Sequence, residues 1–374
     1  MTPTNRYTAL DVFRGMTICF MIIVNTPGNH PTTYAPLLHA EWNGFTPTDL
    51  VYPSFLFAVG NAMSFAMQKW ADMSQAQVLM KIFKRTLLLF IIGYVMYWFP
   101  FIKYGPDGHA VLKPFAQTRV FGVLQRIALC YGIAALLIYY LKPKGALIIS
   151  IFFLIACRLI LLWFGEPGNE LSMTGNAGTK IDYWLIGPDH MYHGEGIPFE
   201  PEGLLSTFPA VVNVIAGYIA GRFIQFYGKT WEMLAKLLLA GCVLLGLAYC
   251  WDLNFPINKK LWTSSFVLLT TGLCCIILAV VVYCIDFLGK KRWAWFFEVL
   301  GKNALFIYLL SGTGALVLHA VRIKKDMTLY KWIFERIFRY AGQYPGSLLF
   351  AIWFMLMCWF VGWWMDKRKI YIRI

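Results

Sequence analysis

The sequence contains few charged residues. They make up 14% of its 374 residues, whereas hydrophobic residues make up 59%, and soluble domains usually contain near a quarter charged residues. The mean hydropathy is +0.59. This shortage of charge argues against an ordinary soluble domain. Apolar stretches of roughly 20 residues, long enough to span a bilayer, recur along the chain. The sequence therefore predicts a membrane protein.

Paired cysteines and familiar catalytic motifs are also lacking. None of the nine cysteines has a CxxC partner, and all but Cys250 lie within apolar runs, so buried, inert thiols and no metal site are expected. There is no Walker loop, dinucleotide-binding glycine fingerprint, HExxH pair or GxSxG elbow. A cleavable signal peptide is not expected, because the first apolar run carries Asp11 and Arg14 and lacks a cleavage pattern.

The net charge of +14 comes mostly from basic residues at the ends of apolar runs. A nucleic-acid-binding protein would instead need a basic face on a soluble domain, so the expected partner is the lipid bilayer and not a nucleic acid. The pattern predicts an all-α fold, a polytopic transmembrane helical bundle of about ten spans. The predicted spans are 10–27, 48–68, 79–101, 117–141, 145–165, 203–226, 233–251, 262–287, 299–321 and 347–365.

Lys and Arg in the short loops predict that both termini are cytoplasmic. The segment 26–48 has neither residue, and the loop 166–202 has only Lys180 among many acidic residues, so both are expected outside. The basic segment 322–339 disagrees with this orientation, and its placement stays open. We predict a single domain over residues 1–374, with a periplasmic loop at 166–202 whose length is typical of functional loops. The shorter stretch 329–341 indicates an interfacial or re-entrant helix.

The first span carries charge at its start and an amide at its end. Asp11 and Arg14 are three residues apart and can pair on one helix face. Asn25 follows Arg14 by eleven residues, so both share a face and lie roughly 16 Å apart. One helix can thus hold an anion at its cytoplasmic end and place an amide at the far end. The alternative is an interfacial ion pair and an amide that only contacts water.

His39 and Asp49 flank a polar segment after the first span. Imidazole titrates near neutral pH, so His39 is a candidate general base, and Asp49 could orient it or hold a cationic acceptor. A surface histidine and an ordinary helix start are the structural alternatives.

Four further polar residues lie in or beside predicted spans. Arg126 is an intramembrane charge beside Gln125, and such charges mark functional sites by default; pairing with Asp11 or snorkelling are its structural alternatives. Lys302 and Asn303 lie near the cytoplasmic start of a span, where a basic residue and an amide can bind phosphate.

An ordered set of motifs resembles the heparan-α-glucosaminide N-acetyltransferase family and its bacterial relatives. The resemblance runs from about Arg6 to the C-terminus, without the luminal N-terminal domain and extra first helix of the lysosomal enzymes. The motifs are Leu10–Gly15, Asn25, His39 with Trp42-Asn43-Gly44, Asp49 with Pro53, Gly122–Arg126, Pro201-Glu202-Gly203, Pro256–Trp262 and the basic C-terminal tail.

The resemblance implies a transmembrane acyltransferase that moves an acetyl group from cytoplasmic acetyl-CoA to the amine of a glucosamine-type sugar. It implies His39 as the catalytic histidine with Asn25 beside it and Asp49 in the same motif, a bacterial inner-membrane location, and a homodimer. Without the luminal domain, a small amino sugar or cell-wall fragment is the expected acceptor. The coenzyme A ligands expected from these arguments are Arg14, Gln125, Arg126, Lys302 and Asn303.

Two mechanisms and two other functions stay open. His39 either takes a proton from the acceptor in a ternary complex or becomes acetylated itself. An amino-sugar transporter without acyl transfer is the alternative function, although no internal repeat of the kind many transporters have is found. A non-catalytic scaffold would leave His39, Asn25 and Arg126 without a role.

Overall fold

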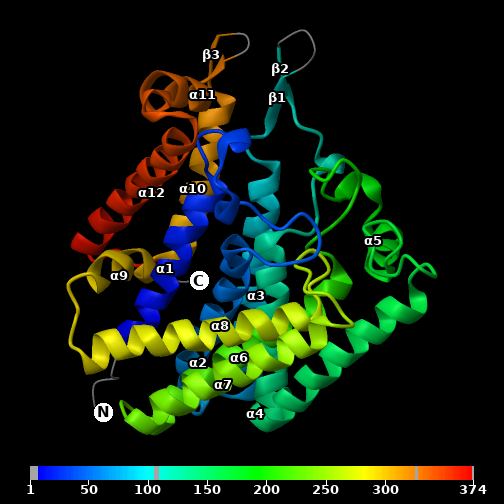
Figure 1. Cartoon of the computed structure of the whole chain (residues 1–374), viewed down its shortest axis with the longest axis vertical. Helices are drawn as coiled ribbons and strands as arrows, with labels where there is room; N and C mark the ends of the chain where they lie inside the picture. The colour runs from blue at the N-terminus through cyan, green and yellow to red at the C-terminus, as the bar shows by residue number, and fades with distance from the viewer. Residues whose placement is uncertain (1–6, 105–108, 325–326, 373–374) are drawn as a thin grey trace. The chain divides into compact units, whose positions relative to one another are not determined.

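The computed structural model describes residues 7–104, 109–324 and 327–372. It is almost entirely helical (Figure 1), which confirms the predicted all-α polytopic fold. Contacts divide the chain into two compact units, 1–39 with 46–55 and 277–373, and 40–45 with 56–276. The prediction of a single acyltransferase domain stays a prediction.

The first unit is built from the two ends of the chain. Its described elements are α1 (Thr8–Asn25), η1 (His30–Thr32), η2 (Ala35–Leu37), η3 (Pro47–Leu50), η7 (Tyr283–Phe287), α9 (Ala294–Lys302), α10 (Ala304–Ala320), β3 (Arg322–Lys324), β4 (Met327–Thr328), α11 (Leu329–Ile333), η8 (Phe334–Phe338), η9 (Arg339–Ala341) and α12 (Gln343–Lys367).

The second unit holds the middle of the chain. Its described elements are η4 (Met67–Trp70), α3 (Gln75–Trp98), β1 (Ile102–Tyr104), β2 (Ala110–Leu112), η5 (Phe115–Gln117), α4 (Val123–Phe164), α5 (Ala177–Ile186), η6 (Pro188–His190), α6 (Leu204–Tyr227) and α7 (Trp231–Asp252). The helices α2 (Val51–Ala66) and α8 (Ser264–Val282) each contribute residues to both units.

Glycines allow the closest helix contacts within each unit. In the first, a Cβ atom on Gly15 of α1 would lie 1.8 Å from the carbonyl oxygen of Phe297, and one on Gly301 of α9 would lie 2.0 Å from that of Asp11. In the second, a Cβ on Gly60 of α2 would lie 1.9 Å from the carbonyl oxygen of Val214 on α6. Small residues let helix backbones approach this closely, as in membrane helix pairs.

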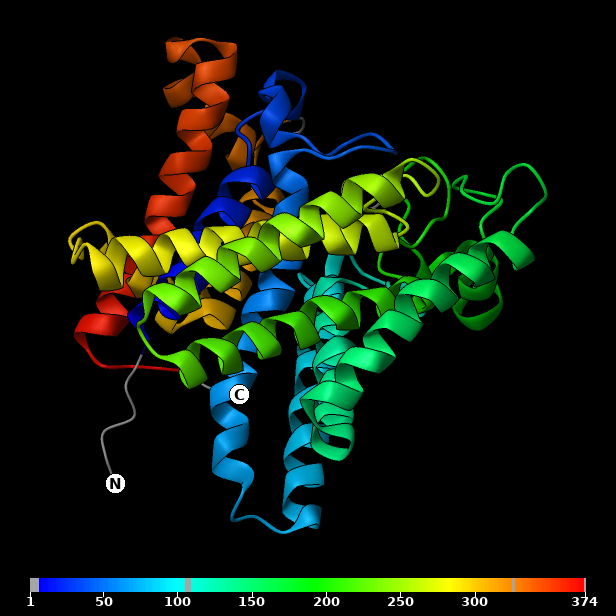
Figure 2. The ribbon, with the colours of Figure 1, turned by 60° about the horizontal axis from the view of Figure 1, so that its bottom comes forward.

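The helix α4 breaks at Lys142, whose φ of 60° and ψ of 172° are not helical, and Pro143 follows. Proline lacks the N–H that would continue the helix, and Figure 2 shows the resulting change of direction. The break falls in the gap between the two spans predicted at 117–141 and 145–165. The structure therefore has two helical arms here, in line with the two predicted spans.

The predicted count of ten spans is wrong for the described residues. Seven helices are long and apolar enough to cross a membrane, or eight if the bent pair α9–α10 is one span. The α4 range is counted once among these candidates, although the break at Lys142 divides it into two arms. The helix α3 is not among the candidates, and it carries Lys81, Lys84 and Arg85. The predicted span 299–321 is also not straight, because α9 and α10 meet at 83°.

Most cysteine thiols are buried, as the sequence predicted. Cys19, Cys130, Cys157, Cys274, Cys275 and Cys358 are buried, and Cys284 is half-buried. The exceptions are Cys242 and Cys250, which are exposed on α7. The short predicted helix at 329–341 is present as α11 with the π-helical turn η8.

Candidate functional site

A histidine–aspartate pair forms in the first unit where the chain enters η3. The Nδ1 atom of His39 lies 2.7 Å from Oδ1 of Asp49. The side chain of His39 is 48% exposed, whereas that of Asp49 is 1% exposed. A buried carboxylate therefore orients an imidazole that solvent can reach. When Nδ1 carries the proton in this bond, the lone pair of a neutral imidazole is on Nε2, which is the atom that would act as a base.

Local sequence explains why Asp49 is in place. Thr46 precedes η3 and Asp49 is its third residue, which makes a capping box. The second carboxylate oxygen of Asp49 accepts a hydrogen bond from the backbone N–H of Thr46 at 3.0 Å. The helix-start role and the orienting role of Asp49 are thus compatible, because each uses a different oxygen.

Asn25 is the last residue of α1 and is exposed. It lies in the same unit as His39 and Asp49, and α1 packs against η3. The structure therefore gathers the three predicted catalytic residues in one unit and joins His39 to Asp49 directly. The neighbouring role of Asn25 stays a prediction.

Three predicted coenzyme A ligands gather at the junction of α9 and α10. Arg14 donates through Nε to the carbonyl of Gly301 at 2.7 Å, and through Nη2 to Asp11 at 2.8 Å. The predicted Asp11–Arg14 pair is therefore confirmed. Gly301 is followed directly by Lys302 and Asn303, so a helix end, two cations and an amide meet at this junction.

Lys302 and Asn303 also contact residues near the C-terminus. The ammonium of Lys302 lies 3.2 Å from Glu298 and 3.0 Å from Asp366. The side chain of Asn303 donates to the carbonyl of Ile370 and accepts from the N–H of Ile372, each at 3.0 Å. Two carboxylates thus neutralise Lys302, and a phosphate that bound here would have to exchange for one of them.

Gln125 and Arg126 lie in the second unit and are fully buried. Nη2 of Arg126 donates to the carbonyl of Pro201 at 2.7 Å and also bonds the hydroxyl of Ser206. Its guanidinium lies 4.9 Å from the centre of the Trp262 ring. Arg126 therefore does not snorkel.

Several polar atoms of this pair have no hydrogen-bond partner among the described residues. They are both side-chain polar atoms of Gln125 and the Nε and Nη1 atoms of Arg126. A buried polar atom without a hydrogen-bond partner costs free energy, so these atoms are suited to bind a polar ligand or water.

Motifs distant in sequence meet in this unit. The indole N–H of Trp42 donates to the carbonyl of Leu171 at 3.0 Å, and Asn258 donates to Asn43 at 3.1 Å. Trp262 contacts Arg126, which holds the turn at Pro201. The four motifs that include Trp42, Arg126, Pro201 and Trp262 therefore support one another.

Sequence reasoning missed a buried charge network around Arg119. Arg119 donates to Glu200, with Nε at 2.9 Å from Oε2, and to Glu202 at 2.5 Å. Burial raises the pKa of Glu200 to about 7 although Arg119 opposes this, and Glu202 adds to the rise. Burial also opposes ionisation of Glu202, but Arg119 and Arg126 outweigh it and hold that pKa below its usual value. Arg119 thus forms ion pairs with both Glu200 and Glu202.

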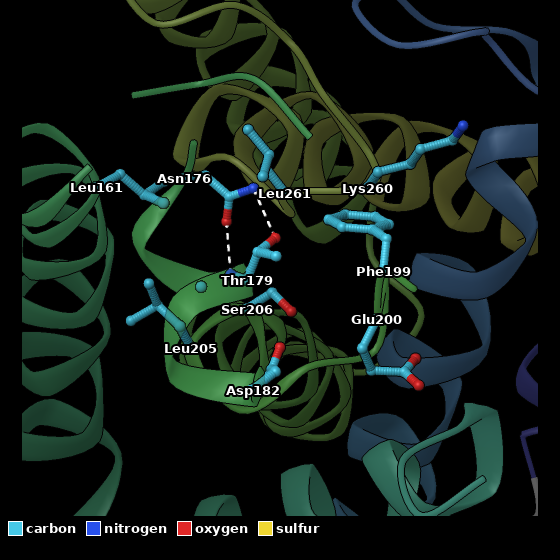
Figure 3. A pocket seen from close by; sticks show the side chains of 11 residues that line it. Leu161, Asn176, Thr179, Asp182, Phe199, Glu200, Leu205, Ser206, Lys260 and Leu261 are labelled. Carbon is cyan, nitrogen blue, oxygen red and sulfur yellow. Dashed lines mark hydrogen bonds between the residues drawn. The ribbon is translucent and has the colours of Figure 1, made fainter. Parts of the chain in front are cut away.

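Asp182 of α5 lines the same small cavity as Glu200 and caps α6. Its Oδ1 accepts from the N–H of Leu204, the first residue of α6, at 2.9 Å. A Cβ on Gly203 would lie 1.8 Å from Oδ2 of Asp182, so a larger residue there would displace the carboxylate. Burial raises the pKa of Asp182 to about 6. Figure 3 shows Asp182, Glu200 and Ser206 around a small cavity, of a size for one water.

Among the described residues, no group of three or more His, Cys, Asp and Glu side chains is arranged to hold a metal ion.

A family model described as "Heparan-alpha-glucosaminide N-acetyltransferase, catalytic" matches residues 6–236. The chain is 27% identical over 364 residues to the mouse (Mus musculus) protein named heparan-alpha-glucosaminide N-acetyltransferase, an alignment that covers 82% of this chain and 53% of that protein. It is 28% identical over 361 residues to the human (Homo sapiens) protein of the same name, covering 81% and 52%. The chain spans about half the length of these curated relatives.

Proposed function

Because the chain belongs to the heparan-α-glucosaminide N-acetyltransferase family, we propose that it is a transmembrane N-acetyltransferase that uses acetyl-CoA. The acceptor in this proposal is the amine of a glucosamine-type sugar on the periplasmic side of a bacterial inner membrane. The observation that carries the proposal is the 2.7 Å contact between His39 and a buried Asp49, because acyl transfer to an amine needs an oriented base.

In the proposed reaction, the neutral acceptor amine attacks the thioester carbonyl carbon. The C–N bond forms, His39 Nε2 takes a proton from nitrogen, and the C–S bond then breaks. The thiolate of coenzyme A leaves and takes up a proton. Asp49 stabilises the imidazolium that forms on His39. Asn25 donates to the carbonyl oxygen as it becomes negative, which by analogy contributes about 3–4 kcal/mol.

The donor is proposed to bind from the cytoplasmic side. Arg14, Lys302 and Asn303 are the ligands for its phosphates, and the contact of Arg14 with Gly301 next to Lys302 supports this grouping. Phosphate at the start of α10 would also benefit from the helix dipole. Gln125 and Arg126 stay proposed coenzyme A ligands, because both side chains are buried and several of their polar atoms have no hydrogen-bond partner among the described residues.

The decisive experiment compares His39→Ala with the intact chain in proteoliposomes that contain acetyl-CoA inside and glucosamine outside. We expect transfer to be abolished while coenzyme A binding is retained. The matched control is His193→Ala. His193 is also exposed in a loop, and among the described contacts its Nδ1 atom pairs with the backbone carbonyl of Met191. Transfer by His39→Ala at the level of the control, or no binding of acetyl-CoA by the folded protein, would contradict the proposal and favour an amino-sugar transporter.

A further inference from the structure

The last described residues of the chain lie against the junction of α9 and α10. The helix α12 ends at Lys367, and residues 368–372, which we call the C-terminal strap, follow it without helical structure. The chain turns at Lys369, whose φ of 57° is left-handed, and the N–H of Ile370 donates to the carbonyl of Met365 at 2.9 Å. This backbone conformation is sterically disfavoured for a residue with a side chain, so contacts beyond the turn must hold the strap in place.

The strap pairs its backbone with the side chain of Asn303. The amide nitrogen of Asn303 donates to the carbonyl of Ile370, and its oxygen accepts from the N–H of Ile372, each at 3.0 Å. Asn303 is 1% exposed. With the strap in this position, the amide is therefore closed to a phosphate that arrives from solvent.

The strap also holds a carboxylate against Lys302. The hydroxyl of Tyr371 donates to Oδ1 of Asp366 at 2.8 Å, and the same oxygen lies 3.0 Å from the ammonium of Lys302. Glu298 lies 3.2 Å from that ammonium on its other contact. Two carboxylates against one ammonium leave a negative charge, which repels a phosphate.

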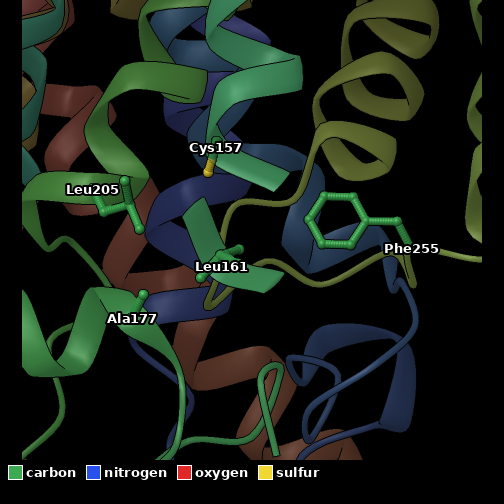
Figure 4. Packing of buried hydrophobic residues seen from close by; sticks show 5 residues of the cluster. All are labelled: Cys157, Leu161, Ala177, Leu205 and Phe255. Atoms are coloured by element: carbon green, nitrogen blue, oxygen red, sulfur yellow. The ribbon is translucent and has the colours of Figure 1, made fainter. Parts of the chain in front are cut away.

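Polar contacts hold the strap, and apolar packing contributes little. Ile370 and Ile372 are 41% and 45% exposed. Firmly packed segments of the chain differ from this: Ala177, at the start of α5, lies in a buried cluster with Leu161 and Leu205 (Figure 4). Because hydrogen bonds of an exposed segment exchange with water at little net cost, the strap can be released without unfolding the helices beneath it.

We propose that the C-terminal strap closes the phosphate site of the donor, and that coenzyme A binds when the strap is released. The inference rests on the proposed function, which assigns phosphates to Arg14, Lys302 and Asn303, and it deepens that function by adding regulation of the same site. Release exposes the amide of Asn303 and removes the hydroxyl that holds Asp366 against Lys302. Phosphate oxygens then take the positions of the Ile370 carbonyl and the Asp366 carboxylate. A passive tether for the end of the chain is the competing role.

The first experiment measures binding of coenzyme A to the detergent-purified full chain by isothermal titration. Ile372→Pro removes the N–H that bonds Asn303, whereas Ile372→Ala keeps it and is the matched control. Apparent affinity falls with the fraction of molecules in the closed state. We therefore expect Ile372→Pro to bind about fivefold more tightly than Ile372→Ala, the factor that corresponds to one hydrogen bond.

A second pair of variants tests the tyrosine hydroxyl without changing the backbone. Tyr371→Phe loses the hydrogen bond to Asp366 and should also bind coenzyme A more tightly than the intact chain. Tyr183→Phe is its control, because it loses a hydroxyl hydrogen bond to Pro198 in the other unit. This control should bind as the intact chain does.

Hydrogen exchange reports on the strap directly. Saturating coenzyme A should speed amide exchange in residues 368–372 of the intact chain. Peptides from the start of α5, which the buried cluster of Figure 4 holds, are the internal reference and should not change.

The outcomes separate the strap from the proposed function. Equal affinity of Ile372→Pro and Ile372→Ala, or slower exchange of the strap with coenzyme A bound, overturns the strap and leaves the proposed function in place. Lower thermal stability of Ile372→Pro with unchanged affinity identifies a passive tether and also overturns it. If Ile372→Pro binds coenzyme A more tightly but no variant transfers acetyl, the strap is supported and the proposed function fails. No coenzyme A binding by any folded variant contradicts both.

Discussion

Two regions of the molecule pair a buried carboxylate with a nitrogen-containing side chain, and the pairs differ in how exposed that side chain is. In the first unit, Asp49 is buried but its partner His39 is 48% exposed. In the second unit, Glu200 is fully buried and its partner Arg119 is only 14% exposed. Histidine can gain and lose a proton near neutral pH, whereas arginine stays charged. The first pair is therefore suited to proton transfer, and the second to holding backbone segments together.

The largest expected effect comes from changing Asp49 to Asn. The amide keeps an acceptor for the N–H of Thr46 but can no longer orient and stabilise a protonated His39. By analogy with other histidine–aspartate pairs, we expect transfer to fall about 10³–10⁴-fold. Initial rates in proteoliposomes provide the measurement, and thermal unfolding should change little. Full activity would mean that His39 does not depend on this contact.

Arg119→Ala should instead act on stability. It leaves Glu200 and Glu202 buried without their shared cation, and breaking a buried ion pair costs about 3–5 kcal/mol. The control is Lys236→Ala, which removes an exposed pair with Glu232 on α7 and should leave stability unchanged. Thermal unfolding of the two variants in one detergent makes the comparison. Equal stability would show that the buried network does not hold the second unit together.

Gly15→Ala tests the helix that carries Asn25 without touching His39 or Asp49. A Cβ atom there would lie 1.8 Å from the carbonyl oxygen of Phe297, so α1 and α9 must separate. We expect a loss of about 1–3 kcal/mol, typical of overpacking, and reduced transfer. Gly246→Ala on α7 is the matched control, because a Cβ there has nothing within 4 Å. Thermal unfolding and transfer assays on both variants should differ only for Gly15.

The smallest effect is a pH dependence set by Asp182. Its pKa rises from 3.8 to about 6 in the folded chain, so the protonated form is favoured by folding. The stability from this group is complete below pH 4 and is lost as pH rises through 6. Asp182→Asn stays neutral and should flatten the dependence of melting temperature on pH in this window.

Asp182→Ala is the control for the hydrogen bond to Leu204. It removes the acceptor for the first N–H of α6 and, compared with Asp182→Asn, should lose about 1 kcal/mol at every pH. An unchanged pH profile in Asp182→Asn would assign the dependence to another group, with Glu200 next in line because its pKa is about 7.

Local patterns in the sequence predicted the contacts that lie close along the chain. The Asp11–Arg14 pair spans one helical turn, and His39 and Asp49 meet across a short polar segment. Long apolar runs also predicted the polytopic fold, which follows from length and composition alone. The candidate coenzyme A ligands could be named but not grouped, because nothing local indicates that Arg14 reaches Gly301.

Contacts between distant segments could not be predicted from one sequence. Glu200 is 81 positions from Arg119, and the acidic loop that contains it gave no indication of which carboxylate would be buried. The span count failed for a related reason. Hydropathy records apolar length but not the direction of the backbone, and the 83° bend between α9 and α10 does not change the apolar content.

Because the cysteines differ in exposure, chemical labelling can determine how the chain is oriented in the membrane. Cys250 is exposed near the end of α7, while Cys19, Cys130 and Cys157 are buried. A maleimide that cannot cross the bilayer would alkylate Cys250 in intact cells if that end of α7 faces outward, and only after lysis if it faces inward. Replacing Cys242 with serine would leave Cys250 as the exposed thiol on this helix. The thiol of Cys250 thus provides a covalent record of sidedness.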